Sequence, residues 1–216
     1  MLRLSQFAPL VNGLSWIEPL DLVLRSGEWV MIQGRNGSGR STLAQALAGH
    51  HDHQGEWVIN GQVLSRHQPQ QRFFHGVTYV PEHRDVFADL NPTEHLHLGL
   101  GPRGSWRDAN ACQRVNDALA RLPSLHKRMH LQAKHLSGGE QQLLSVARAL
   151  ISSPKCVILD EPFEGLAKQA RRELLSWLLY LQTQGLMLIW FEQSTPEEVL
   201  PHVSQVLHLD RGIWSK

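Results

Sequence analysis

The sequence predicts an α/β protein with a mostly parallel sheet, an antiparallel β segment near its N-terminus and an inserted helical segment. An apolar run, Glu28–Gln33, leads directly into a glycine-rich turn and a helical pattern. Two further apolar runs, Cys156–Leu159 and Leu186–Phe191, are separated by a helix-length segment, as expected for parallel strands covered on both faces. Residues 83 to about 151 carry mostly helical patterns.

The remaining strands are short and bounded by turn signals. Asn60-Gly61 separates two apolar stretches and favours a tight hairpin, so antiparallel strands are expected beside the first strand–turn–helix unit. Val77–Val80 is expected to be a strand. A closing hairpin is expected around Asp210-Arg211-Gly212.

Length and composition indicate one domain with an insertion. The chain has 216 residues, 42% of them hydrophobic, which is enough for one substantial core. Its 21 Lys and Arg residues balance 20 Asp and Glu residues, so the excess of positive charge expected of a dedicated nucleic-acid binder is missing and no nucleic-acid partner is expected. Cys112 and Cys156 lack the spacing of a disulfide framework or a zinc site, which favours a reducing, cytosolic setting.

No segment of the sequence reads as a signal peptide or a membrane span. The N-terminus lacks a basic region followed by an apolar run, and polar residues interrupt the most apolar stretch, residues 174–191. Histidines crowd together at His50, His51 and His53, where a solvated loop is the favoured interpretation and a metal site the alternative.

The turn after the first strand has the spacing of a phosphate-binding loop. Gly34 and Gly39 are five residues apart and are followed by a cation, Arg40, and a hydroxyl residue, Ser41. Glycines let consecutive N–H groups converge on phosphate oxygens, and the following helix directs its positive end at the same anion. Ser41 is the expected Mg²⁺ ligand. An ordinary glycine-rich turn would not explain the spacing, the strand and the hydroxyl together.

Two carboxylates follow the strand Cys156–Leu159. Asp160 and Glu161 stand at the carboxyl end of that strand, the edge where ligands bind in open α/β sheets. We expect Asp160 to hold Mg²⁺ and Glu161 to polarise the water that attacks the γ-phosphate. A plain turn begun by Asp-Glu-Pro is the alternative.

A second phosphate signal begins the helix predicted after Leu136. Ser137 and Glu140 have capping-box spacing. Capping does not explain Gly138 and Gly139, each of which costs about 1 kcal/mol inside a helix. They are expected if some group approaches the backbone closely, and a helix N-terminus suits a phosphate. Because the chain already has one phosphate loop, this second site is predicted to serve a partner's nucleotide.

Together these three motifs resemble the ABC ATPase family, in family order and spacing, over nearly the whole chain. The resemblance implies a P-loop NTPase (RecA-like) core with an antiparallel β subdomain in residues 1–82 and 152–216, and a helical subdomain in 83–151. It implies a head-to-tail dimer with ATP and Mg²⁺ at the interface. The residues implied to bind ATP are Gly34, Arg35, Asn36, Gly37, Ser38, Gly39, Arg40, Ser41 and Thr42 of one subunit, with Ser137, Gly138, Gly139 and Glu140 of the other.

Short segments look most like the ATPase subunits of branched-chain amino acid and urea importers. By that resemblance Glu82 senses Mg²⁺ and the membrane partner, and is grouped with Ser41 and Asp160 as a metal residue. Gln193 stands where most of the family has a switch histidine, and residues 164–167 are the loop that couples the two sites. The implied catalytic residues are Glu161, Gln193 and Arg40.

Three departures from the family pattern bear on activity. Arg40 replaces lysine, and its planar fork is not equivalent to an ammonium. Gln193 has no titrating imidazole. No aromatic stands near Val11, where the family stacks a ring on adenine, so Trp16 or Phe7 would have to substitute.

The function that the resemblance implies is ATP-driven movement of separate integral membrane subunits, with the chain peripheral on the cytoplasmic face of the inner or plasma membrane. Its expected partners are those subunits and a second ATPase subunit of the same or a paralogous chain. One alternative is a chiefly ATP-binding, regulatory subunit that completes a composite site with a competent paralogue, a hypothesis prompted by Arg40. The other is an ABC ATPase with no role in transport.

Overall fold

The computed structural model describes residues 1–103 and 106–215. The chain divides into two compact units. The first contains residues 1–79, 155–161 and 181–216, and the second contains residues 80–154 and 162–180.

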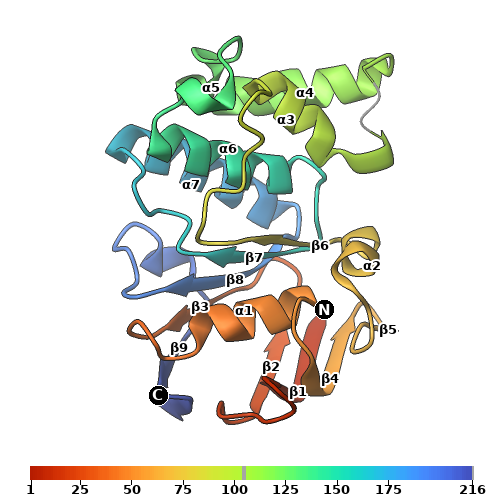
Figure 1. Cartoon of the computed structure of the whole chain (residues 1–216), viewed down its shortest axis with the longest axis vertical. Helices are drawn as coiled ribbons and strands as arrows, with labels where there is room; N and C mark the ends of the chain where they lie inside the picture. Colours follow the sequence, from red (N-terminus) through yellow and green to blue (C-terminus); the bar gives the residue numbers. More distant parts are fainter. Residues whose placement is uncertain (104–105, 216) are drawn as a thin grey trace. The chain divides into compact units, whose positions relative to one another are not determined.

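A six-stranded sheet forms the centre of the first unit (Figure 1). Its strand order is β10-β9-β3-β8-β7-β6. The strands are β3 (Trp29–Gln33), β6 (Val77–Val80), β7 (Cys156–Asp160), β8 (Met187–Glu192), β9 (Gln205–Asp210) and β10 (Ile213–Ser215). Neighbours from β9 through β3 and β8 to β7 run parallel, whereas β10 is antiparallel to β9. The predicted parallel sheet and its closing hairpin are therefore confirmed.

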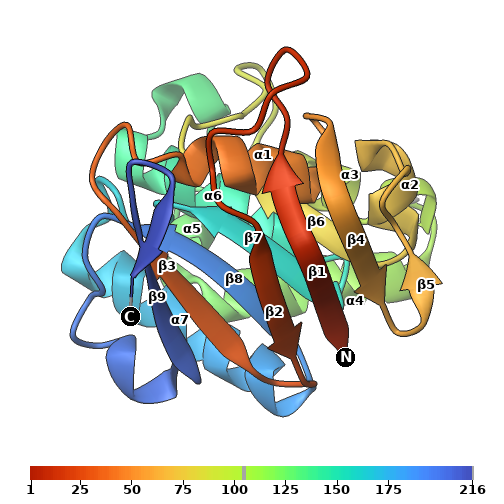
Figure 2. The ribbon, with the colours of Figure 1, turned by 90° about the horizontal axis from the view of Figure 1, so that it is seen from below.

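A second, antiparallel sheet in this unit has the order β2-β1-β4-β5 (Figure 2). Its strands are β1 (Leu2–Pro9), β2 (Leu20–Leu24), β4 (His53–Ile59) and β5 (Gln62–Val63). Asn60 and Gly61 join β4 to β5 with φ of 47° and 81°, the positive values that a tight hairpin turn requires. The hairpin was predicted, but β1 and β2 were not. Burial alternates strictly along β2, but this strand has only five residues, so its sequence is too short to establish the period.

The helix α1 (Arg40–Ala48) packs into a core that draws side chains from both sheets. Leu43 and Leu47 are fully buried in a cluster that includes Leu4 from β1 and Ile158 from β7. Both sheets thus bury apolar side chains against α1, and this burial fixes the helix whose first residue is Arg40. A short helix that was not predicted, α2 (Pro69–Phe74), completes this unit together with a 3-10 turn at Leu200–His202.

The second unit is helical. It contains α3 (Pro92–Gly99), α4 (Ala109–Arg121), α5 (Pro123–His126), α6 (Gly138–Leu150) and most of α7 (Lys168–Thr183), with 3-10 turns at Gly101–Arg103 and Ala133–His135. Leu143, Ala147, Leu150 and Ile151 are buried, as the sequence pattern of α6 predicted. Among the residues that the structure describes, no helix is both long and apolar enough to cross a bilayer.

Candidate functional site

The glycine-rich loop joins the end of β3 to the start of α1, so the core holds it at both ends. Two of its glycines have no space for a side chain. A Cβ at Gly34 would collide with the carbonyl of Leu209 and the hydroxyl of Ser38. Gly39 has φ of 105° and lies against the side chains of Trp16 and Ile17. The loop therefore keeps a backbone path that only glycine adopts at these points.

Two buried polar atoms of this loop have no hydrogen-bond partner among the described residues. They are the hydroxyl oxygen of Ser38, whose residue is 2% exposed, and Nη1 of Arg40, whose residue is 5% exposed. Buried polar groups are nearly always satisfied, and an unsatisfied one costs about 1–3 kcal/mol. Both atoms are donors beside a helix N-terminus, so a bound phosphate would satisfy them. The loop thus fits the phosphates of a nucleotide.

The acidic pair lies at the end of β7, on the same sheet. Asp160 is 1% exposed and is the last residue of β7, paired with Phe191 of β8. Glu161 follows with φ of 47°, an unusual conformation for glutamate, and its N–H donates to the carbonyl of Phe191. The Glu161 carboxylate accepts a hydrogen bond of 2.6 Å from Nη2 of Arg40. The structure therefore joins the phosphate loop directly to the acidic pair.

Asn36 connects this ion pair to Gln193. The carboxamide oxygen of Asn36 accepts from Nη2 of Arg40 at 3.3 Å and from Nε2 of Gln193 at 2.8 Å. Asn36 thus links Arg40 to Gln193, and Arg40 is bonded to Glu161, so the three residues predicted to act in catalysis belong to one chain of hydrogen bonds.

The expected magnesium residues fall in both units. Ser41 is in the first turn of α1, next to Thr42, and Asp160 ends β7, so both belong to the first unit. Hydroxyl and carboxylate oxygens are the ligands that Mg²⁺ prefers. Glu82 belongs to the second unit, where its carboxylate lies within 4.8 Å of that of Glu164.

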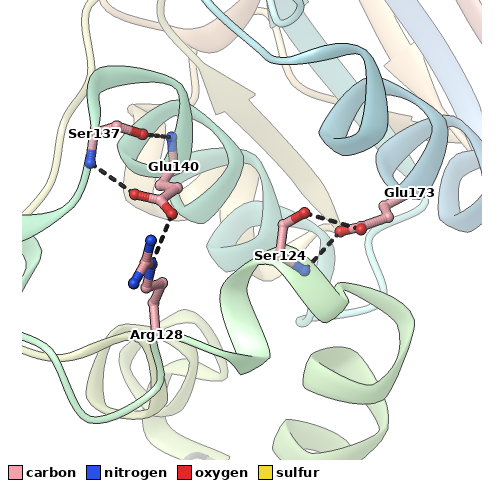
Figure 3. Close-up of polar contacts among 5 residues, drawn as sticks. All are labelled: Ser124, Arg128, Ser137, Glu140 and Glu173. Atoms are coloured by element: carbon pink, nitrogen blue, oxygen red, sulfur yellow. Dashed lines mark hydrogen bonds and ion pairs between the residues drawn. The ribbon is translucent and has the colours of Figure 1, made fainter.

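The second expected phosphate site is the start of α6, whose capping box is formed (Figure 3). The Ser137 hydroxyl accepts from the N–H of Glu140 at 3.3 Å, and the Glu140 carboxylate accepts from the N–H of Ser137 at 2.8 Å and from Arg128 at 3.0 Å. Burial by itself raises the pKa of Glu140, but these hydrogen bonds together outweigh it and lower that pKa. Glu140 is therefore a charged cap that is fully engaged within its own unit.

The two glycines at the start of α6 are closely approached by the chain itself. A Cβ at Gly138 would collide with the guanidinium of Arg84, and one at Gly139 would collide with the carbonyl of Gly165. Arg84 and the loop at Gly165 thus approach the backbone of these two glycines closely. Glycine at both positions follows from this packing.

The structure distinguishes the two aromatic residues considered for adenine. Phe7 is fully buried and packs against His53 with ring centroids 4.4 Å apart, so it belongs to the core. Trp16 is 47% exposed, and its ring edge lies against Gly39 of the phosphate loop. Of these two residues, Trp16 is the one that combines an accessible ring with proximity to the loop.

A residue that the sequence did not point to holds the far end of α1. Arg72 is 2% exposed, and its guanidinium donates to the carbonyls of Ala46, Leu47 and His67. Burial lowers its pKa to about 10, so it remains charged at neutral pH. A cation is favourable at a helix C-terminus, where the last carbonyls lack helical partners. Of the three clustered histidines, His53 lies in β4 with its Nε2 3.2 Å from Nη2 of Arg72, whereas His50 and His51 are exposed, as expected of a solvated loop.

Comparison with known proteins identifies the family. The family model described as "ABC transporter" matches residues 17–164. The sulfate/thiosulfate import ATP-binding protein CysA of Xanthomonas campestris is 32% identical over 98% of this chain and 62% of its own length. The branched-chain amino acid transport ATP-binding protein BraG of Pseudomonas aeruginosa is 30% identical over 90% of this chain and 82% of its own.

The chain spans less than two thirds of the length of the CysA proteins that it matches, 61–62% in the two from Xanthomonas campestris and Pseudomonas aeruginosa. Solved structures share its fold. An ATP-binding subunit of an ABC transporter superposes with a TM-score of 0.84 at 24% identity, covering 100% of this chain and 89% of the other. A dimeric ATP-binding cassette bound to ADP and Pi gives 0.83 at 20% identity, covering 100% and 98%.

The family match agrees with three features of the structure, which are the P-loop, the acidic end of β7 and the capped start of α6. The chain therefore belongs to the ABC transporter family as an ATP-binding cassette with a P-loop NTPase fold.

Proposed function

We propose that this chain binds ATP and Mg²⁺ in its phosphate loop and hydrolyses ATP to drive separate membrane subunits. The observation that carries the proposal is a pair of buried donors in that loop, Ser38 Oγ and Arg40 Nη1, which have no partner in the part of the chain that the structure describes. Phosphate oxygens are acceptors that would bond to both of these donors. The family match and the import ATP-binding relatives support the same activity.

In this proposal the loop glycines and α1 hold the phosphates, and Arg40 neutralises their charge. Ser41 and Asp160 would hold Mg²⁺, which would supply positive charge to neutralise the phosphates. Glu161 orients the water and accepts its proton as the water oxygen bonds to the γ-phosphorus and the bond from that phosphorus to the ADP oxygen breaks. Trp16 stacks on the adenine ring.

A second copy of the chain, or a paralogue, is proposed to complete the site with its α6 N-terminus. Ser137 supports this role because its hydroxyl accepts from Glu140 and so keeps its own proton for an external acceptor. The relatives are named for sulfate/thiosulfate import and for branched-chain amino acid transport, and what their names have in common is ATP binding. The proposed function is therefore the ATP-dependent step of transport, carried out at the cytoplasmic face of the membrane.

The first test measures nucleotide affinity by calorimetry and phosphate release with Mg²⁺ present. We expect Arg40→Met to weaken ATP binding by about tenfold or more, because it removes the buried cation. Arg66 is exposed and serves as the matched control, so Arg66→Met should bind as the wild type does. Glu161→Gln should bind ATP and lose turnover. Wild-type protein that binds no nucleotide would refute the proposal.

The dimer is tested separately by sedimentation with Mg²⁺ and a non-hydrolysable ATP analogue. Ser137→Ala should weaken nucleotide-dependent association while leaving ATP binding by the dilute monomer unchanged. Loss of both properties together would contradict a role for Ser137 towards the partner's nucleotide.

The composite-site alternative is favoured by one observation, the contact of Arg40 with Glu161. If the chain is chiefly a binding subunit, Arg40→Lys should raise its turnover towards that of a competent ATPase. Unchanged turnover in this variant would count against the alternative.

A further inference from the structure

The ion pair between Arg40 and Glu161 occupies the place where the phosphate loop meets the acidic pair. The two charged atoms are 2.6 Å apart, and the side chains are only 6% and 12% exposed. Removing a charge from water is costly, so a buried cation and a buried anion each depend on the other. A group that takes Arg40 away from Glu161 must therefore offer a comparable negative charge.

The backbone of each residue is fixed, so the pair is a defined state of the site. Arg40 is the first residue of α1, and Glu161 is held at φ of 47° with its N–H bonded to the carbonyl of Phe191. Asn36 gives Nη2 of Arg40 a second acceptor and is itself held by Gln193. Any change of partner must come from the side chains.

The two terminal nitrogens of Arg40 are in different situations. Nη2 is engaged by Glu161 and Asn36, whereas Nη1 is buried and has no partner among the described residues. A first phosphate oxygen can bond to Nη1 and leave the ion pair intact. A further phosphate beside Glu161 would compete for Nη2 and would also repel the carboxylate.

We propose that the Arg40–Glu161 pair is a latch that the γ-phosphate opens, so that it makes the site discriminate between nucleoside triphosphates and diphosphates. A diphosphate binds through Nη1 with the latch closed. A triphosphate takes Nη2 as well and releases the Glu161 carboxylate to the attacking water. Asn36 and Gln193 are positioning residues that hold the guanidinium in line. The inference rests on the proposed function of nucleotide binding at this loop and adds what selects the nucleotide.

The test is a double-mutant cycle on affinity, which needs no turnover. Mg²⁺ with a non-hydrolysable ATP analogue, and separately Mg²⁺ with ADP, are titrated by calorimetry into wild type, Glu161→Gln, Arg40→Met and the double variant. Glu161→Gln should raise the affinity for the triphosphate by about tenfold and the affinity for ADP by less than about twofold, because only the triphosphate has to break the ion pair.

The cycle separates the latch from simple repulsion between Glu161 and the γ-phosphate. Repulsion alone would give Glu161→Gln the same effect with and without Arg40. The latch predicts that most of the gain disappears in the Arg40→Met background. Glu198→Gln removes an exposed carboxylate as a control and should change neither affinity.

The latch is overturned if Glu161→Gln raises affinity equally in both backgrounds, equally for both nucleotides, or not at all. In each of these cases, nucleotide binding by the wild type still supports the proposed function. Absence of any nucleotide binding by the wild type would overturn both.

Discussion

Replacing Arg72 by methionine tests how firmly the far end of the phosphate-loop helix is held. The guanidinium donates to His67 O at 3.0 Å, to Ala46 O at 2.9 Å and to Leu47 O. A hydrogen bond from a charged donor contributes a net free energy of about 1.5–3 kcal/mol.

The sum of the three bonds is an upper limit, because two carbonyls keep another donor after the substitution. Ala46 O still accepts from the N–H of Gly49, and Leu47 O still accepts from the indole of Trp57 at 3.2 Å. We therefore expect Arg72→Met to lower the free energy of unfolding by about 3 kcal/mol and Arg72→Lys by less, since an ammonium keeps part of the charge and fewer contacts.

The assay is urea unfolding at pH 7.5, followed by tryptophan fluorescence and by far-UV circular dichroism. Arg66→Met serves again as the exposed control. A loss below about 1 kcal/mol for Arg72→Met would refute the reasoning, because it would mean that these buried carbonyls are satisfied without the guanidinium.

Three further predictions concern stability. Gly49→Ala should cost about 1–3 kcal/mol, because φ is 89° and the added Cβ would come within 2.9 Å of Nε of Arg72. The pKa of His53 is lowered chiefly by burial, so its neutral form stabilises the fold above about pH 6.5, and this contribution is lost as the pH falls through the lowered pKa. Stability should therefore drop on acidification, and less so in His53→Gln. Glu173→Ala should cost about 3 kcal/mol, because Glu173 is 7% exposed and accepts from both the N–H and the hydroxyl of Ser124, at 3.0 and 2.9 Å (Figure 3).

Two of these predictions have a matched control variant in the same unfolding assay, and the prediction for His53 is tested against the wild type. Gly13 has φ of 78° with nothing within 4 Å of an added Cβ, so Gly13→Ala measures the cost of the backbone conformation alone. If it loses as much stability as Gly49→Ala, crowding by Arg72 does not contribute to the cost at Gly49. If the free energy of unfolding of His53→Gln falls on acidification as much as that of the wild type, His53 is not a cause of the loss of stability. The variant Ser124→Ala keeps the hydrogen bond from its backbone N–H to Glu173, so it should lower the free energy of unfolding by only about 1 kcal/mol. An equally small loss in Glu173→Ala would contradict the reasoning that losing both hydrogen bonds costs more than losing one.

The sequence by itself determined the fold class and the positions of the glycine-rich loop and of the capped start of α6. Its signals were local ones. Continuous apolar runs marked β3, β7 and β8, the Asn60-Gly61 turn marked a hairpin, and capping-box spacing marked the start of α6, all of which the structure confirms. Such signals arise within a few residues of the chain, so they can be detected without knowing what packs against them.

Short edge elements could not be predicted from such local signals. The strand β2 has only five residues, and α2 only six, too few to establish a period, and both are stabilised by neighbours remote in sequence. The strand β1 was missed as well, although it pairs with both β2 and β4. What stabilises such elements is pairing and burial, which depend on the whole fold.

Only the tertiary structure decided which charged groups meet. Arg40 and Glu161 are 121 residues apart, and Asn36 and Gln193 are 157 apart, so no spacing rule relates them. The same holds for Arg72, whose sequence surroundings give no sign that it holds the end of α1. A side chain's partners are set by how distant segments pack, and in this chain that packing turned an unusual arginine in a phosphate loop into one half of a buried ion pair.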